Sequence, residues 1–270
     1  MSAYEPVHEY DTVNLHRAGA VARIELNRPD KMNAWDMQLG LDLRAAVEHV
    51  RDDDSLRAVL LTGAGRGFSS GADLSAGFEP TPEGHPDVHT ALVDRYHPII
   101  VGLRELPKPV LAAVHGPAVG IGCSLALAAD LVLAAESAYF LLAFVNIGLV
   151  PDGGSSAFIP ARIGFTRATE LAMLGERLPA RKALEWGLIN AVHPDAELAQ
   201  AADALAARLA AGPTRSYAGT KRQLNRWVYE GFDAQLELEA AIQQEQAAGA
   251  DFAEGALAFL QKRAPEFKGV

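Results

Sequence analysis

The alternation of apolar and polar residues near the start of the chain predicts two strands joined by a tight turn. Apolar side chains recur at every second position before residue 18, the segment Ala-Gly-Ala over 18–20 marks a turn, and the apolar pattern resumes over 21–26. The segment over 27–35 has the Pro and Asn residues of a loop. This stretch therefore predicts a hairpin followed by an irregular connection.

A helical period follows this loop. Apolar residues three and four positions apart predict an amphipathic helix, with Asp36 as its cap, and they are Leu39, Leu43, Ala46, Val47 and Val50. A short apolar run over 58–63 predicts a strand buried on both faces, and the segments over 109–116 and 130–136 predict two further strands. Helices are expected over 88–104 and, after a glycine turn, within 120–129. Strands that alternate with helices predict the α/β class.

The pattern changes at about residue 197. From there on Ala, Glu and Gln dominate, strand signals stop, and a helical period begins. The segment over 212–217 interrupts this period, and two further helices are expected after it. We therefore divide the chain into a core over 1–196 and a helical C-terminal region over 197–270.

Composition narrows the classes of protein. The 270 residues are 49% hydrophobic and 21% charged, which predicts a chain with a sizeable core. The formal net charge of −10 disfavours nucleic acid as a partner. Cys123 is the only cysteine, which excludes an intrachain disulfide and a cysteine-rich metal site and fits a cytoplasmic protein. No metal site, signal peptide or membrane span is expected, since the most apolar stretch, 110–135, is broken by polar residues and glycines.

Two glycine-rich turns carry the candidate chemistry, one over 63–74 and one at the start of the segment over 120–129. Neither has the spacing of a dinucleotide-binding turn, a phosphate-binding loop or a nucleophile elbow. Two separate loops that each present one backbone N–H group to an oxygen form an oxyanion hole. Tight turns without a ligand are the alternative for either loop alone.

Five motifs, in order, resemble the crotonase superfamily, that is, the enoyl-CoA hydratase/isomerase family, across about residues 10–265. They are IELNRPDKMNAW over 24–35, GFSSGADL over 67–74, LPKPVLAAVHGPAVGIGCSLALAADLVLA over 106–134, FVNIGLVPDGG over 144–154 and LPARKALEWGLINAV over 178–192. The resemblance implies a spiral of ββα turns and a C-terminal helical region that forms a homotrimer or homohexamer. It also implies an acyl-CoA thioester as the substrate, with coenzyme A as part of that substrate and no separate cofactor.

The resemblance further implies roles for individual residues. The oxyanion-hole N–H groups correspond to Ala72 and Ile121. Positions that contact coenzyme A or the substrate in the family correspond to Arg28, Lys31, Met32, Ala34, Ser70, Asp73, Leu74 and Gly120. Arg28 and Lys31 would supply the local positive charge that an acidic protein needs for a polyanionic ligand. Residues 75–90 are expected to line the acyl pocket.

The family's two hydratase glutamates correspond to Ser124 and Phe144, neither of which exchanges a proton at neutral pH. Asp152 remains, at a position that resembles the acid of single-carboxylate enoyl-CoA isomerases, including the ring-opening isomerases of phenylacetate breakdown. One carboxylate suffices to move a proton along an acyl chain, and burial would raise its pKa toward a useful value. A cap before Gly153 is the alternative role. The sequence thus predicts an isomerase; a hydratase and a non-catalytic acyl-CoA-binding protein stay open.

Overall fold

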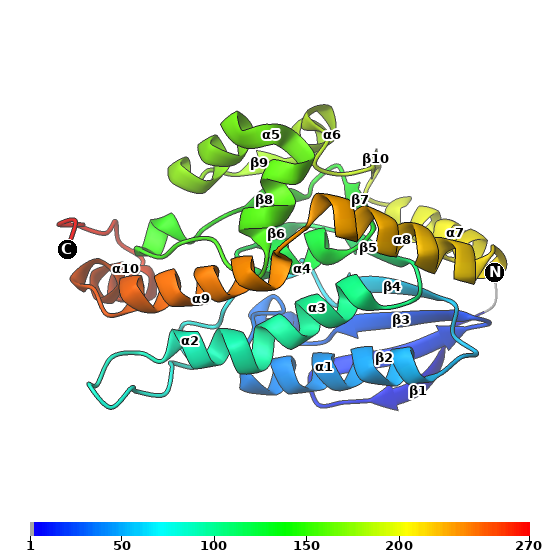
Figure 1. Ribbon diagram of the computed structural model, residues 1–270, viewed down its shortest axis with the longest axis horizontal. Helices are drawn as coiled ribbons and strands as arrows, with labels where there is room; N and C mark the ends of the chain where they lie inside the picture. Colours follow the sequence, from blue (N-terminus) through cyan, green and yellow to red (C-terminus); the bar gives the residue numbers. More distant parts are fainter. Residues whose placement is uncertain (1–2) are drawn as a thin grey trace.

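The computed structural model describes residues 3–270 as an α/β core with helices around it (Figure 1). Its strands form a seven-stranded sheet in the order β1-β2-β3-β4-β5-β7-β10 and a three-stranded sheet in the order β6-β8-β9. The strands are β1 (Glu5–Glu9), β2 (Val13–Ala18), β3 (Val21–Leu26), β4 (Ala58–Gly63), β5 (Val110–Val114), β6 (Pro117–Val119), β7 (Leu131–Ala135), β8 (Tyr139–Leu141), β9 (Leu178–Pro179) and β10 (Ala191–His193). From β3 onward the neighbours in the larger sheet are parallel.

From β5 to β8 the strands alternate between the two sheets, which gives this part of the chain its spiral course. β5 lies in the large sheet, β6 in the small one, and α4 (Ile121–Ala128) follows; β7, β8 and α5 (Ser155–Leu174) repeat this order. The predicted spiral of ββα turns is therefore confirmed. The small sheet and β1 were not predicted, because their strands are too short or too exposed to leave a clear apolar pattern.

Most predicted elements of the core are present. The predicted hairpin forms β2 and β3, and Asp36 caps α1 (Met37–Asp52) by accepting a hydrogen bond from the Leu39 amide. The helix expected over 88–104 consists of α2 (Val88–Ala91), a π-helical turn (Leu92–Tyr96) and α3 (His97–Glu105). β4 and β5 are buried along almost their whole length, as expected for strands covered on both faces.

The C-terminal region is all helical within the described residues, but its helix count differs from the prediction. Three helices, rather than two, follow the break at residue 212. The helices after β9 are α6 (Ala180–Trp186), α7 (Leu198–Ala211), α8 (Thr214–Val228), α9 (Phe232–Ala247) and α10 (Ala250–Leu260). Gly231, in the left-handed conformation with φ of 78°, separates α8 from α9, and this local turn leaves little trace in a helical period.

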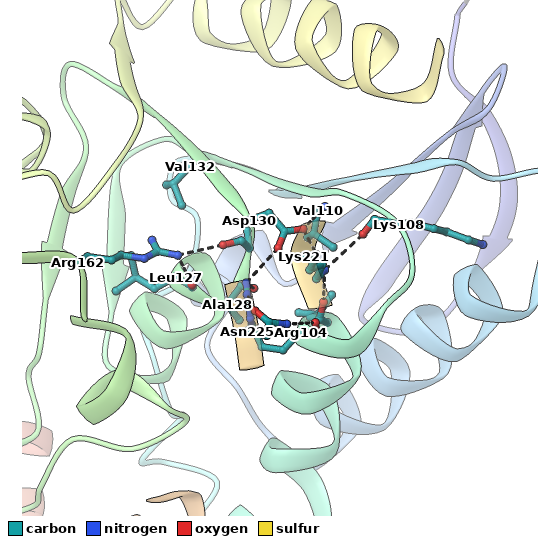
Figure 2. Close-up of polar contacts among 12 residues, drawn as sticks. Arg104, Lys108, Val110, Leu127, Ala128, Asp130, Val132, Arg162, Lys221 and Asn225 are labelled. Atoms are coloured by element: carbon teal, nitrogen blue, oxygen red, sulfur yellow. Dashed lines mark hydrogen bonds and ion pairs between the residues drawn. The ribbon is translucent and has the colours of Figure 1, made fainter. Parts of the chain in front are cut away.

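A buried ion cluster fastens α8 to the core (Figure 2). Asp130, just before β7, accepts hydrogen bonds from the Arg104 guanidinium at 3.1 Å and the Val110 amide at 2.8 Å. The Lys221 ammonium of α8 lies 2.9 Å from the same carboxylate and also donates to the Leu103 carbonyl. One carboxylate thus joins the large sheet, α3 and α8. None of the helices described here has the length and apolar character needed to cross a membrane.

Candidate active site

The two glycine-rich loops lie side by side beyond the carboxyl ends of β4 and β5. Ser69 and Ala118 form a parallel bridge, in which the Ser69 amide donates to the Pro117 carbonyl and the Val119 amide donates to the Ser69 carbonyl, both at 3.0 Å. The two chains then continue together toward Ala72 and Ile121. Ligands of open α/β sheets bind at this edge.

Glycine is required where these loops meet. Gly71 has φ of 91° and Gly120 has φ of 52°, conformations that disfavour other residues. A Cβ atom on Gly71 would lie 2.9 Å from the Val119 carbonyl oxygen, closer than real Cβ atoms approach backbone. These glycines bring Ala72 and Ile121, the residues that follow them, to neighbouring positions.

The backbone N–H groups of Ala72 and Ile121 have no acceptor within residues 3–270. Ile121 is the first residue of α4, where an N–H group has no partner in its own helix. Ala72 pairs with Trp35, but the hydrogen bonds of that bridge use the Trp35 amide and the Asp73 amide. Two such donors on adjacent loops are suited to an oxygen that gains negative charge.

Both residues line a cavity of about 380 Å³. Its walls are mostly apolar, and they come from the two loops, the π-helical turn, the segment over 141–152 and the C-terminal helices α9 and α10. Phe78 and Val88, at the two ends of the irregular segment after the first loop, also line it. Residues 75–90 therefore contribute to the pocket as expected.

Asp152 lines this cavity and stands two residues before Gly154, which precedes α5. Only 5% of it is exposed, its Oδ2 atom accepts a 2.7 Å hydrogen bond from Gln243, and its buried Oδ1 atom has no partner in residues 3–270. Burial, followed by the negative charge of Glu239, raises the pKa of Asp152 to about 8, against the opposing effect of the Gln243 hydrogen bond. Burial therefore raises the pKa of Asp152, as predicted. The role as a cap is not seen for the side chain, because the carbonyl of Asp152 accepts the Ser155 amide instead.

The two residues at the hydratase glutamate positions contribute no acid or base. The Ser124 hydroxyl is fully buried and donates to the Asp152 carbonyl at 2.7 Å. Phe144 lines the cavity with its ring. Cys123, also adjacent to the loop, is buried, and burial raises the pKa of its thiol to about 12, so it is not a nucleophile at neutral pH.

The residues predicted to contact coenzyme A lie in two touching loops, except Gly120, which lies directly before α4. The Ser70 amide donates to the Met32 carbonyl at 2.9 Å, and Asn33, with no exposed surface, donates to the carbonyls of Ala64, Gly67 and Phe68. Of the predicted residues, those that line the cavity are Ser70, Ala72, Leu74, Gly120, Ile121 and Asp152. Those beside it, outside its wall, are Arg28, Lys31, Met32, Ala34 and Asp73.

The two predicted cations differ in their surroundings. Arg28 lies 2.8 Å from Asp36 and 3.3 Å from Asp73, so two carboxylates balance its charge. Lys31 is exposed and makes no ion pair within the described chain. Of the two residues, Lys31 is therefore the one whose positive charge no carboxylate balances, so it can pair with an anionic ligand.

Several residues of the site come from the C-terminal helices and from the π-helical turn, and the sequence alone did not identify them. Gln243 and Phe259 line the cavity from α9 and α10, and Tyr96 lines it from the π-helical turn. Glu239 lies behind the wall, where it accepts the amides of Gly154 and Ser156. Their signal was available: Glu239 and Gln243 occupy the buried stripe of α9.

Comparisons with known proteins agree with this geometry. The family model described as enoyl-CoA hydratase/isomerase matches residues 16–270. The chain is 41% identical to the 1,2-epoxyphenylacetyl-CoA isomerase of Escherichia coli K12, over 94% of this chain and 97% of that protein. It is also 41% identical to a probable enoyl-CoA hydratase of Rhodobacter capsulatus, over 96% and 99%. A crystal structure of an enoyl-CoA hydratase from Mycobacterium avium subsp. paratuberculosis has a TM-score of 0.88 and 38% identity, covering 96% of this chain and 100% of that one.

Proposed function

The chain belongs to the enoyl-CoA hydratase/isomerase family, and we propose that within it this protein is an isomerase that shifts a double bond in an acyl-CoA thioester. One observation carries the proposal: among the cavity-lining residues of the described chain, Asp152 alone has a carboxyl group. A shift of a double bond needs one group that removes a proton and returns it. Addition of water needs an acid and a base, and Ser124 and Phe144 supply neither.

The mechanism begins with the ionised form of Asp152. Its carboxylate removes a proton from the carbon between the thioester carbonyl and the double bond, and the electron pair moves onto the carbonyl oxygen as a dienolate. The N–H groups of Ala72 and Ile121 donate to this oxygen and stabilise its charge. The dienolate then collapses, and Asp152 returns the proton to the far carbon of the former double bond. No atom is gained or lost, and no separate cofactor takes part.

Lys31, Met32, Ala34, Ser70, Asp73, Leu74 and Gly120 are the residues we propose for contacts with coenzyme A and the thioester. The first six lie on two loops that pack against each other, and Ser70, Leu74 and Gly120 line the cavity. The acyl group would occupy the apolar cavity of about 380 Å³. The name of the E. coli relative, 1,2-epoxyphenylacetyl-CoA isomerase, supports a ring-bearing acyl group.

Two other functions remain as alternatives. A hydratase reading is favoured by the name of the Rhodobacter relative, a probable enoyl-CoA hydratase. A non-catalytic acyl-CoA-binding protein would keep the loops and cavity without using Asp152. In each case the ligand is the same class of thioester, so binding alone does not separate the three.

Absorbance of the conjugated thioester separates them. We expect it to rise when the protein is mixed with 3-hexenoyl-CoA and to stay constant with crotonyl-CoA. A fall with crotonyl-CoA would support the hydratase instead, and no change with either substrate, while coenzyme A still binds, would support the binding protein. Asp152→Ala is expected to abolish isomerisation and retain binding, and full activity of this variant would remove Asp152 as the base.

A homotrimer, or a homohexamer built from two trimers, is the assembly we propose. The support is large apolar surface on the outer helices: Trp227 is 86% exposed and Leu224 is 58% exposed, both on α8. Light scattering is expected to give three or six times the chain mass, and Trp227→Glu is expected to lower it. A monomeric mass for the unchanged protein would contradict the proposal.

A further inference from the structure

Helix α9 presents two polar side chains in a buried stripe that is otherwise apolar. Glu239 is 3% exposed and Gln243 is not exposed at all, and they share the stripe with Leu236, Ala240 and Ala247. Burial of polar groups is costly unless they form hydrogen bonds. Both side chains do form them, and both bond to the segment over 150–156, which contains Asp152.

The hydrogen bonds of Gln243 determine the orientation of its amide. Its Oε1 atom accepts from the Val150 backbone amide at 3.3 Å, and its Nε2 atom donates to Asp152 Oδ2 at 2.7 Å. A backbone amide can only donate, so the side chain of Gln243 cannot reverse its two ends without losing this bond. Oδ2 of Asp152 is therefore always an acceptor.

A consequence follows for the proton of Asp152. Because a carbonyl oxygen accepts this bond better than a hydroxyl oxygen does, Gln243 favours the neutral acid with its proton on Oδ1, the oxygen that lacks a partner within residues 3–270. Asp152 lines the cavity, so Oδ1 is the oxygen left for the substrate. The amide of Gln243 thus distinguishes two oxygens that are chemically equivalent in a free carboxylate.

Glu239 binds the backbone of the turn that contains Asp152. Its oxygens accept the amides of Gly154 at 2.8 Å and Ser156 at 3.0 Å, which fixes the backbone directly after Asp152. It is not among the cavity-lining residues, so it cannot meet the substrate itself. Burial raises the pKa of Glu239 itself to about 7, so Glu239 is mostly ionised only above that pH. Second to burial, this negative charge raises the pKa of Asp152, whereas the Gln243 hydrogen bond lowers that pKa. The other titratable group close to Asp152 is the hydroxyl of Tyr96.

We propose that Gln243 and Glu239 are positioning residues for Asp152: Gln243 reserves Oδ1 for the proton exchanged with the substrate, and Glu239 holds the turn and places a negative charge behind the carboxyl group. This inference rests on the proposed function, in which Asp152 is the base. It assigns to the C-terminal region a part in the chemistry as well as in packing.

Gln243 lowers the pKa of Asp152 and Glu239 raises it, so variants of the two residues are expected to shift the pH profile in opposite directions. The ratio kcat/KM for 3-hexenoyl-CoA is expected to rise with pH as Asp152 ionises. Gln243→Met removes the hydrogen bond that favours the carboxylate, so the rise is expected to move up by at least about one pH unit, with KM within about twofold of the original. Glu239→Gln removes the neighbouring charge, so the rise is expected to move to lower pH.

Matched controls come from the exposed side of the same helix. Gln246→Met and Glu245→Gln make the same chemical changes there and are expected to leave the pH profile in place. If Gln243→Met does not fold, Gln243→Asn replaces it, because its shorter side chain withdraws the amide from Oδ2 and is expected to move the profile in the same direction.

The results for these variants distinguish a failure of this proposal from a failure of the proposed function. Opposite shifts for Gln243 and Glu239 variants support it. Profiles that stay at the original pH, or that move together in one direction, overturn it, provided that Asp152→Ala is inactive. Full activity of Asp152→Ala would instead overturn the proposed function, whatever the other variants do.

Discussion

Gly71 and Gly120 face each other so closely that a Cβ atom built on either would lie within 4 Å of the Cα atom of the other, at 3.8 and 3.9 Å. Each immediately precedes a residue whose N–H group has no acceptor in the described chain, Ala72 and Ile121. The contact between two glycines therefore sets the separation of the two donors. A Cβ atom on Gly71 would collide with the Val119 carbonyl oxygen at 2.9 Å, whereas one on Gly120 would make ordinary contacts and is disfavoured by the φ of 52° instead.

Gly71→Ala is expected to lower kcat by about 100- to 1000-fold, the typical effect of losing one oxyanion-hole donor. The added methyl group would collide with the Val119 carbonyl oxygen and displace the Ala72 amide. Gly19→Ala is the control, since Gly19, in the turn between β2 and β3, also has a positive φ, of 59°, but has no atom within 4 Å of the added Cβ and does not line the cavity. Steady-state kinetics on 3-hexenoyl-CoA measure both, and equal losses in the two variants would contradict the expectation.

The charge of Lys31 is expected to act on binding rather than on chemistry. Lys31→Met should raise KM for the thioester by about three- to tenfold at low ionic strength and leave kcat unchanged, and the difference should shrink as added salt screens the charge. Lys182→Met, which removes an exposed cation from α6, serves as the control. A KM that does not change in Lys31→Met would exclude Lys31 from the coenzyme A contacts.

Stability is expected to depend on pH through Asp152. The pKa of this buried acid is raised to about 8, so the folded chain holds the proton more tightly than the unfolded chain, and the stabilising contribution of this proton is lost as pH rises toward and through 8. The Asp152→Asn variant has no acid at this position, so its stability is not expected to decrease for this reason as the pH rises. Denaturant unfolding at pH 6 and pH 9 is expected to show that the wild-type free energy of unfolding falls by at least about 1.4 kcal/mol more than that of the variant. Equal decreases would mean that Asp152 does not titrate in this range.

The residues of the ion cluster at Asp130 are expected to contribute unequally to the free energy of unfolding. Asp130→Asn leaves the buried charges of Arg104 and Lys221 without a partner and should cost about 3 kcal/mol. Lys221→Met leaves Asp130 paired with Arg104 and should cost about 1–2 kcal/mol. Arg44→Met, which breaks an exposed pair on α1, should cost no more than about 0.5 kcal/mol. A reversed order in denaturant unfolding would contradict this view of the cluster.

The regular elements of the core were predictable because their apolar patterns are long and are set by the buried sheet. β4 and β5 are continuous apolar runs, and α1 has five apolar residues on one face. The three-stranded sheet was not predictable in this way. Its strands have two or three residues each and depend on long-range pairing, such as that of Tyr139 with Pro179, which no local pattern encodes.

In the site, too, residues within short motifs were predictable from the sequence, whereas contacts between distant segments were not. Ala72, Ile121 and Asp152 lie in motifs of a few residues, and the structure places all three around one cavity. Their roles, and the contacts with coenzyme A, stay predictions. Gln243 could not be connected with Asp152 from the sequence, because 91 positions separate them and only the tertiary packing of α9 brings them together. A polar residue in a buried stripe was the available signal, but it does not name its partner.

The hydrogen bond between Asp152 and Gln243 also concerns the order in which the chain is made. During synthesis from the N-terminus, Asp152 and both glycine loops emerge before helix α9 exists. A nascent or truncated chain that ends before residue 243 contains Asp152 without the amide that donates to its Oδ2 atom. If Asp152 is the proposed base, such a chain lacks the residue proposed to orient it, and the site is complete only once α9 has been translated and has packed.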